Sequence, residues 1–216
     1  MHMFAERFFG GNGIVGAQVP VGVGLGFAQK YLDTGGVSLA MYGDGAANQG
    51  QVFEAYNLAA IWKLPVIFIC ENNKYAMGTS VERSTLDPEF YKRGGVIPGL
   101  RVNAMDVLAV RQALKFGQRY CLKHGPLVME FETYRYHGHS MSDPGTSYRT
   151  REEISAVRKD RDPPKLLARQ LAQVGIDPLQ LKSIDDRVKQ LVDDEAELAI
   201  NDPVPTVECD LYTDVY

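Results

Sequence analysis

Three polar residues of this sequence have the types and the spacing of a magnesium site. Asp44 lies in Gly43-Asp44-Gly45, directly after the apolar run at residues 37–42, and Asn72-Asn73 follow a second apolar run at residues 65–70. Carboxylate and amide oxygens are the ligands that Mg²⁺ prefers, and this ion often shares its shell with phosphates. Each half alone is typical of an ordinary turn. Both halves after consecutive apolar runs, one helix apart, favour a functional site.

The residues around Asp44 also suit an anion. A helix is expected to begin near Ala47-Asn48, and a helix N-terminus offers free N–H groups and the positive end of a dipole. Gly43 and Gly45 let the backbone turn sharply and come close to a ligand. The sequence therefore predicts a site for Mg²⁺ together with a diphosphate.

The elements that would position these residues form a βαβ unit. Residues 37–42 and 65–70 are short apolar runs typical of buried parallel strands, and residues 48–63 between them have helical spacing. A glycine-rich loop is expected at residues 10–16 and a helix at 17–32, in which glycines allow close packing. Parallel strands place ligands beyond their carboxyl ends, where Asp44 and Asn73 lie.

The rest of the chain continues this alternation and then becomes helical. We predict a short helix at 87–93, a strand at 100–102, a helix at 106–124 with Asp106 as N-cap, a strand at 126–134, a surface loop at 138–150 and helices at 152–158, 164–174 and 184–200. The expected fold class is α/β, with a mainly parallel central sheet flanked by helices. Residues 1–150 would form the ligand-binding domain and residues 151–216 a C-terminal helical extension.

Composition excludes several classes of function. The chain has 216 residues, 45% of them hydrophobic, and a net charge of -4, so it suits one globular domain and gives no reason to expect nucleic acid or an anionic membrane as partner. The longest apolar run, residues 64–70, is far too short to span a membrane. The first residues lack the basic-then-apolar pattern of a leader, so we expect none in this sequence.

Three segments carry a resemblance to a known family. They are residues 10–18 (GGNGIVGAQ), residues 42–50 (YGDGAANQG) and residues 134–145 (YRYHGHSMSDPG). With Asn72-Asn73, they resemble the alpha subunits of thiamine diphosphate-dependent 2-oxo acid dehydrogenases, and within that family the pyruvate dehydrogenases of the mitochondrial type. The similarity runs over essentially the whole chain.

The resemblance implies which residues bind the cofactor and its ion. Asp44, Asn73 and the backbone carbonyl of Tyr75 would bind Mg²⁺. Gly45 and Ala46 would contact the diphosphate of thiamine diphosphate.

Three further residues have implied roles at the same site. The backbone of Gly13 and Val15 would bind the aminopyrimidine end of the cofactor, and His139 would be a catalytic residue at the site's entrance near the diphosphate. The family also has an N-terminal part with a Tyr-Arg pair and a catalytic His, which this sequence is expected to lack.

The implied reaction is oxidative decarboxylation of pyruvate with reductive acetylation of a lipoyl group, which feeds acetyl-CoA synthesis. The implied partners are a beta subunit in an α2β2 heterotetramer, required for activity, and the lipoyl-bearing dihydrolipoyl acetyltransferase. The implied location is the mitochondrial matrix.

Serine phosphorylation is a further implication of the resemblance. Ser140, Ser147 and Ser80 match inhibitory sites on which pyruvate dehydrogenase kinase and phosphatase act. A phosphate adds about -1.5 to -2 charges, which at Ser140 would repel a bound diphosphate and disorder the loop. Spacing alone indicates only an ordinary solvated loop.

Two other motifs permit different interpretations. His137 and His139 could be metal ligands, but the sequence places no third suitable ligand nearby outside a flexible loop. Gly11-x-Gly13-x-x-Gly16 matches the dinucleotide fingerprint, and Asp33 follows about 20 residues later. The fingerprint requires a preceding apolar strand, whereas residues 2–9 are mixed and charged.

Two rival functions stay open at this stage. One is the alpha subunit of a branched-chain 2-oxo acid or acetoin dehydrogenase, although residues 134–142 favour pyruvate. The other is a non-catalytic truncated subunit that binds only partner proteins. Cofactor binding would separate the second rival from the enzyme.

Overall fold

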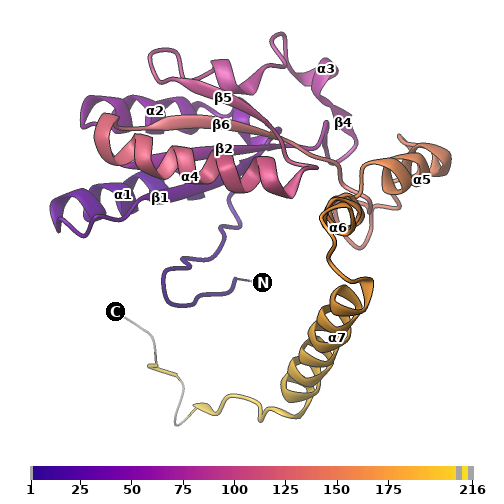
Figure 1. The fold of residues 1–216 in the computed structure, drawn as a ribbon. Coiled ribbons are helices and arrows are strands. Elements are labelled where there is room, and N and C mark those ends of the chain that lie inside the picture. The colour runs from indigo at the N-terminus through magenta and orange to yellow at the C-terminus, as the bar shows by residue number, and fades with distance from the viewer. Residues whose placement is uncertain (1, 208–210, 214–216) are drawn as a thin grey trace. The chain divides into compact units, whose positions relative to one another are not determined.

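The computed structural model describes residues 2–207 and 211–213, which divide into two units. The first unit extends to Leu167 and the second begins at Ala168. In the first unit, the described residues form a four-stranded parallel sheet in the order β1-β2-β6-β5. The strands are β1 (Ser38–Gly43), β2 (Val66–Asn72), β5 (Gly99–Asn103) and β6 (Leu127–Glu132). The predicted α/β fold with a parallel central sheet is confirmed (Figure 1).

Helices cover both faces of this sheet because its strands are apolar on both sides. The covering helices are α1 (Gln18–Tyr31), α2 (Gly50–Ile61) and α4 (Val107–His124). Successive side chains of β2 point to opposite faces. Phe68 and Cys70 share a buried cluster with residues of α1 and α2, whereas Ile67 and Ile69 share a second cluster with residues of α4. The order β1-α2-β2 is the predicted βαβ unit (Figure 1).

Two glycines let α1 lie directly on the sheet. A Cβ atom at Gly22 would be 2.7 Å from the Cβ of Ala40, and one at Gly26 would be 2.4 Å from a methyl carbon of Val66. Any larger residue would push the helix away from β1 and β2. The glycines of this helix thus permit close packing, as predicted.

The structure confirms most of the predicted elements and adjusts their ends. The helix at 48–63 is preceded by a 3₁₀ turn, η1 (Ala46–Asn48), and α2 itself begins at Gly50. Asp106 caps α4 as predicted, since its Oδ1 atom accepts hydrogen bonds from the backbone N–H groups of Leu108 (2.8 Å) and Ala109 (3.2 Å).

The prediction for residues 87–93 is wrong in part. Only a 3₁₀ turn, η2 (Phe90–Lys92), forms there. The Oδ1 atom of Asp87 accepts a hydrogen bond from the backbone of Glu89 (3.0 Å), and such a local bond competes with a regular helix. The hairpin of β3 (Tyr75–Ala76) with β4 (Thr79–Ser80) and the short helix α3 (Val81–Ser84) escaped prediction, because such short elements show no periodicity.

Helices dominate the chain after the sheet. They are α5 (Arg151–Asp160), α6 (Pro163–Gln173) and α7 (Pro178–Asn201). Thr150 caps α5 and Asp177 caps α7, each through its side-chain oxygen, and α7 begins six residues before the predicted helix at 184. Across the described chain, no helix combines the length and apolar composition needed to cross a bilayer.

Candidate functional site

Asp44 is the first residue beyond β1, and its side chain is buried, with 3% exposed. Burial raises the pKa of its carboxyl. Hydrogen bonds from the backbone N–H groups of Asp44 and Asn73, and the positive charges of Arg135 and Lys74, act in the opposite direction but do not cancel the effect. The positive charges nearby therefore do not offset the burial of the carboxylate, and a divalent cation beside it would stabilise its charged form.

The turn after Asp44 packs against the β3–β4 hairpin. A Cβ atom at Gly45 would lie only 2.6 Å from the Cβ of Ala76 in β3. Glycine is therefore required where the two segments meet. This contact, and the pairing of Gly43 with Glu71 at the ends of β1 and β2, bring together the two halves of the predicted site.

The second half of the site is a tight turn after β2. Lys74 has a φ of 73°, in the left-handed region that non-glycine residues rarely adopt. The Oδ1 atom of Asn73 accepts a hydrogen bond from the backbone of Tyr75 (3.3 Å). The backbone oxygen of Tyr75 accepts one from Nη1 of Arg135 (3.1 Å). Because a carbonyl oxygen has two lone pairs, Tyr75 can still offer one to a cation.

The set of donor groups fits Mg²⁺. The side chains of Asp44 and Asn73 and the carbonyl of Tyr75 offer one carboxylate, one amide and one carbonyl oxygen. Over the part of the chain that the structure describes, no group of three or more His, Cys, Asp or Glu residues is placed to hold a metal. Few oxygen ligands with room for phosphate oxygens suit Mg²⁺, whereas transition metals favour nitrogen and sulfur.

The predicted aminopyrimidine-binding loop is tied to both elements that flank Asp44. Nε2 of Gln51, in the first turn of α2, donates to the backbone oxygen of Val15 (3.3 Å). Gln18 accepts from the backbone of Gly16 (3.0 Å) and donates to the backbone oxygen of Met41 in β1 (3.1 Å). Gly13 and Val15 are exposed. The loop is thus anchored through α2 and β1, the two elements on either side of Asp44.

The surroundings of the Gly11-x-Gly13-x-x-Gly16 match are not those of a dinucleotide site. Among the described residues before Gly11, the only pairing is an isolated antiparallel bridge between Ala5 and Phe8. The fingerprint requires a strand of the parallel sheet there.

Arg135 connects the loop at 138–150 to the β3–β4 hairpin. Besides its bond to Tyr75, its Nη2 atom donates to the backbone oxygen of Met77 (2.9 Å) and to the hydroxyl of Tyr148 (2.8 Å). Its Nε atom donates to the backbone oxygen of His137 (3.2 Å). One guanidinium group therefore holds the hairpin and both ends of the loop.

Arg149 also contacts the backbone that leads into this loop, and it is buried, with 3% exposed. Its two terminal nitrogens donate to the backbone oxygens of Arg135 and His137, the second at 2.9 Å. Its guanidinium lies 5.2 to 5.8 Å from the ring centres of three tyrosines, Tyr75, Tyr134 and Tyr148. Its Nε atom is buried without a hydrogen-bond partner. The three rings and the backbone carbonyls thus accommodate the buried cation.

Asp143 orders the part of the loop that carries His139. Its carboxylate accepts hydrogen bonds from the backbone N–H groups of His139 and Gly145, both at 2.8 Å, and from the hydroxyl of Tyr148 at 2.6 Å. These bonds, with that from His139 the strongest influence, lower the pKa of Asp143 to about 2. The side chain of His139 is exposed.

The three serines singled out in the sequence occupy different surroundings. Ser140 and Ser147 are exposed on the loop, and the hydroxyl of Ser140 lies 3.2 Å from that of Ser142. Ser80 is half-buried at the end of β4, where it pairs with Tyr75.

Sequence reasoning missed several residues that shape the site. Arg135, Tyr148 and Arg149 gave no periodic signal, because they act through contacts that only the folded loop creates. Glu130, which is buried in β6 and bonded to Asn72, did leave a signal. It is a charged residue between the buried apolar residues Met129 and Phe131, a pattern that indicates a specific partner.

Comparison with known proteins identifies the family of the chain. A family model, the dehydrogenase E1 component, matches residues 1–208. The chain is 58% identical over 210 residues to the human "Pyruvate dehydrogenase E1 component subunit alpha, somatic form, mitochondrial", a match covering 96% of this chain and 54% of that protein. It is also 58% identical over 219 residues to the "Pyruvate dehydrogenase E1 component subunit alpha, mitochondrial" of Schizosaccharomyces pombe, covering 100% of this chain and 54% of that protein. The chain spans about half the length of the curated relatives it matches.

Proposed function

The chain belongs to the dehydrogenase E1 component family, and from that premise we propose that it forms part of the alpha subunit of a mitochondrial pyruvate dehydrogenase. The identity of 58% to relatives of that name supports this proposal. The reaction would be oxidative decarboxylation of pyruvate with reductive acetylation of a lipoyl group. The acetyl group would then pass to coenzyme A.

The proposed cofactor is thiamine diphosphate bound with Mg²⁺. When bound, thiamine diphosphate supplies the carbanion that attacks the 2-oxo group and the electron sink that follows decarboxylation. The carboxylate of Asp44, the amide oxygen of Asn73 and the carbonyl of Tyr75 would hold the ion. The backbone of Gly45 and Ala46 would face the diphosphate.

One observation carries this assignment. In the register of β1 with β2, Gly43 pairs with Glu71, so the buried carboxylate of Asp44 and the Asn72-Asn73 turn follow the carboxyl ends of two adjacent parallel strands. Ligands of α/β sheets bind at such ends. The need for counter-charge at Asp44 gives a cation a reason to bind there.

Other residues of the chain would orient the cofactor and exclude water. The backbone of Gly13 and Val15 would contact the aminopyrimidine end, with Val15 held by Gln51. His139 would act as a catalytic residue at the entrance. The bonds from Asp143 and Arg135 to the surrounding backbone support this role, because they give the loop of His139 a defined conformation.

The proposed partners follow from the same membership. A beta subunit would complete an α2β2 heterotetramer and the active site, and a lipoyl-bearing dihydrolipoyl acetyltransferase would accept the acetyl group. The helical extension from Arg151 onward would pack on partner subunits. In support, α7 leaves apolar side chains exposed along its length, including Ile184, Val188 and Leu191. The complex would lie in the mitochondrial matrix, as the names of the relatives suggest.

Phosphorylation is proposed as the regulation of this subunit. Ser140, Ser147 and Ser80 would be substrates of a pyruvate dehydrogenase kinase and phosphatase. The backbone oxygen of Ser140 accepts a hydrogen bond from the backbone of Asp143 (3.1 Å). A phosphate on Ser140 would thus stand close to a carboxylate that orders the loop, and their repulsion would loosen it.

The rival functions differ in substrate or in cofactor binding. A branched-chain 2-oxo acid or acetoin dehydrogenase would use the same cofactor site with another substrate. A non-catalytic subunit would lack the cofactor. The matches to relatives named for pyruvate favour the first proposal.

The test uses the full-length alpha subunit purified with its beta subunit. Calorimetric titration of thiamine diphosphate, with and without Mg²⁺, is expected to show binding that requires the ion and is lost in Asn73→Ala. Three reactions are then compared: decarboxylation of pyruvate, decarboxylation of a branched-chain 2-oxo acid, and oxidative cleavage of acetoin. Preference for a substrate other than pyruvate would reject the proposed specificity, and absence of ion-dependent binding would reject the cofactor site.

A further inference from the structure

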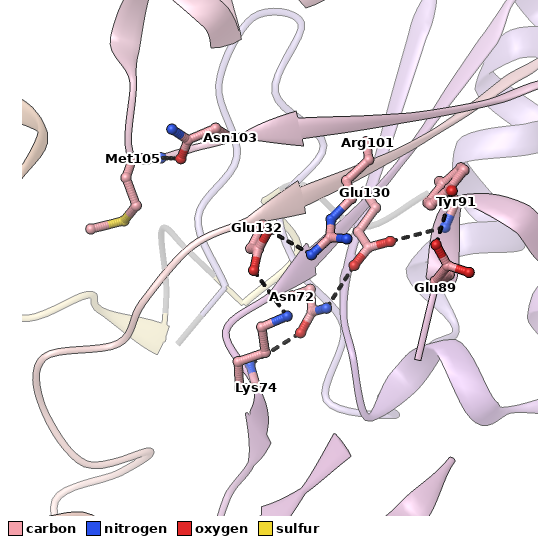
Figure 2. A network of polar contacts seen from close by, with 9 residues as sticks. All are labelled: Asn72, Lys74, Glu89, Tyr91, Arg101, Asn103, Met105, Glu130 and Glu132. Atoms are coloured by element: carbon pink, nitrogen blue, oxygen red, sulfur yellow. Dashed lines mark hydrogen bonds and ion pairs between the residues drawn. The ribbon is translucent and has the colours of Figure 1, made fainter. Parts of the chain in front are cut away.

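Glu130 is a buried carboxylate with two specific hydrogen bonds. It lies in β6 with 1% of its surface exposed. Its Oε1 atom accepts from Nδ2 of Asn72 (2.7 Å), and its Oε2 atom accepts from the backbone N–H of Tyr91 (3.2 Å) (Figure 2). In the part of the chain that the structure describes, Glu130 forms no ion pair within 4 Å. A buried polar side chain is unfavourable unless it is hydrogen-bonded, and these two bonds satisfy both oxygens of Glu130.

Asn72 connects Glu130 to the turn after β2 through two hydrogen bonds. It is fully buried, and while its Nδ2 atom donates to Glu130, its Oδ1 atom accepts from the backbone N–H of Lys74 (3.1 Å). A carboxylate only accepts hydrogen bonds. Glu130 therefore fixes the orientation of the Asn72 amide, with the NH₂ group toward β6 and the oxygen toward the turn (Figure 2).

The turn needs this support because Lys74 has the left-handed φ of 73°. Its backbone oxygen accepts from the N–H of Val81 (3.0 Å), and its Nζ atom pairs with Oε1 of Glu132 at 3.1 Å. Glu132 also belongs to β6. Glu130 and Glu132, both in β6, thus stabilise a backbone conformation of Lys74 that is otherwise unfavourable (Figure 2).

We propose that Glu130 is a positioning residue for the metal-binding turn: through the Asn72 amide it sets the backbone of Lys74, and so places the flanking oxygens of Asn73 and Tyr75. Glu130 itself touches neither ion nor cofactor. The inference rests on the proposed function, since it requires that these oxygens bind Mg²⁺.

The test measures Mg²⁺ binding in the full-length alpha subunit with its beta subunit, at a fixed concentration of thiamine diphosphate. In Glu130→Gln, one of the two acceptors becomes a donor, so either the bond to Tyr91 or the orientation of Asn72 is lost. The dissociation constant of Mg²⁺ is expected to rise about tenfold, in keeping with the loss of a charge-assisted hydrogen bond.

A second substitution provides a rescue. In Glu130→Gln with Asn72→Asp, the new amide donates to the new carboxylate, which can still accept from the backbone of Lys74, and the net charge is unchanged. The dissociation constant of Mg²⁺ is expected to return to within about threefold of the wild-type value. The single variant Glu130→Gln, by contrast, is expected to raise it about tenfold. Such a recovery would show that residues 72 and 130 act as a hydrogen-bonded pair.

Two controls separate positioning from general stability. Glu54→Gln makes the same replacement at an exposed position of α2 and leaves both bonds of Glu130 and the pairs of Glu132 intact. Ile67→Val weakens the core under α4 and lowers the thermal midpoint. Both are expected to bind Mg²⁺ as wild type does. If Glu130→Gln does not fold, Glu130→Asp keeps the charge, shortens its reach and is expected to weaken binding similarly.

The outcomes distinguish this inference from the proposed function. Wild-type affinity in a folded Glu130→Gln or Glu130→Asp, or a folded double variant without recovery, would overturn the role of Glu130 and leave the cofactor site standing. If the wild-type complex does not bind Mg²⁺ with thiamine diphosphate, the proposed function fails and the inference fails with it.

Discussion

The Nη1 atom of Arg135 donates a hydrogen bond of 3.1 Å to the backbone oxygen of Tyr75, 60 residues earlier in the chain. The oxygen is one of the three proposed ligands of Mg²⁺, and the arginine lies three residues before the loop at 138–150, which carries His139. A change in the loop can therefore alter the proposed metal site directly, without any change in the sheet.

Replacing Arg135 by methionine is expected to loosen the loop. The variant loses the bonds to Tyr75, Met77 and Tyr148, and a hydrogen bond to a charged group contributes about 1.5–3 kcal/mol. Hydrogen exchange of residues 137–149 in the full-length complex should become at least tenfold faster, which corresponds to about 1.4 kcal/mol. Arg111→Met, on the exposed surface of α4, is the matched control. Equal exchange in the two variants would contradict the role of Arg135.

Asp143 gives the loop a dependence on pH. Its pKa is about 2, below the value of about 3.9 for an ordinary aspartate. Because the folded-state pKa is lowered, its stabilising contribution is complete above about pH 3.9 and is lost as pH falls toward the folded-state value. Asp143→Asn is therefore expected to lower the thermal midpoint at pH 7, and to differ less from wild type at pH 3. A difference that grows on acidification would show that other groups order the loop.

The contact between Gly45 and Ala76 can be tested by exchange of the two residues. In Gly45→Ala, the added methyl group would lie 2.6 Å from the Cβ of Ala76, and such overpacking costs about 1–3 kcal/mol. Binding of thiamine diphosphate should weaken accordingly in a calorimetric titration. Adding Ala76→Gly removes the clash and should restore binding. Failure of the second substitution to restore binding would mean that the methyl group at residue 45 obstructs the ligand itself.

The sequence was sufficient to predict the fold and the centre of the candidate site for a physical reason. Apolar runs bounded by glycine indicate buried parallel strands, and parallel strands end at the same edge of the sheet. Asp44 and Asn73 could therefore be paired from the sequence alone, and in the folded chain both follow paired ends of the adjacent strands β1 and β2.

The supports of the site could not be predicted in the same way. Arg135 and Arg149 contact the backbone of an irregular loop and of a hairpin with two-residue strands, and neither segment has a periodic pattern. Whether their partners would be carbonyls, rings or water depends on the folded path of the chain. The roles of Gly13, Val15 and His139 stay predictions, since they depend on how a ligand lies.

The most direct test of the proposed site is the ligand-induced shift in thermal midpoint of Asp44→Asn in the full-length complex. Without ligand, the variant should be at least as stable as wild type, because it removes a carboxylate whose burial outweighs the influence of the positive charges around it. With Mg²⁺ and thiamine diphosphate at about 100 times the dissociation constant, wild type should gain about 2.7 kcal/mol and a higher midpoint, and the variant should gain neither. An equal ligand-induced shift in both proteins would contradict the assignment of Asp44 as the metal-binding carboxylate.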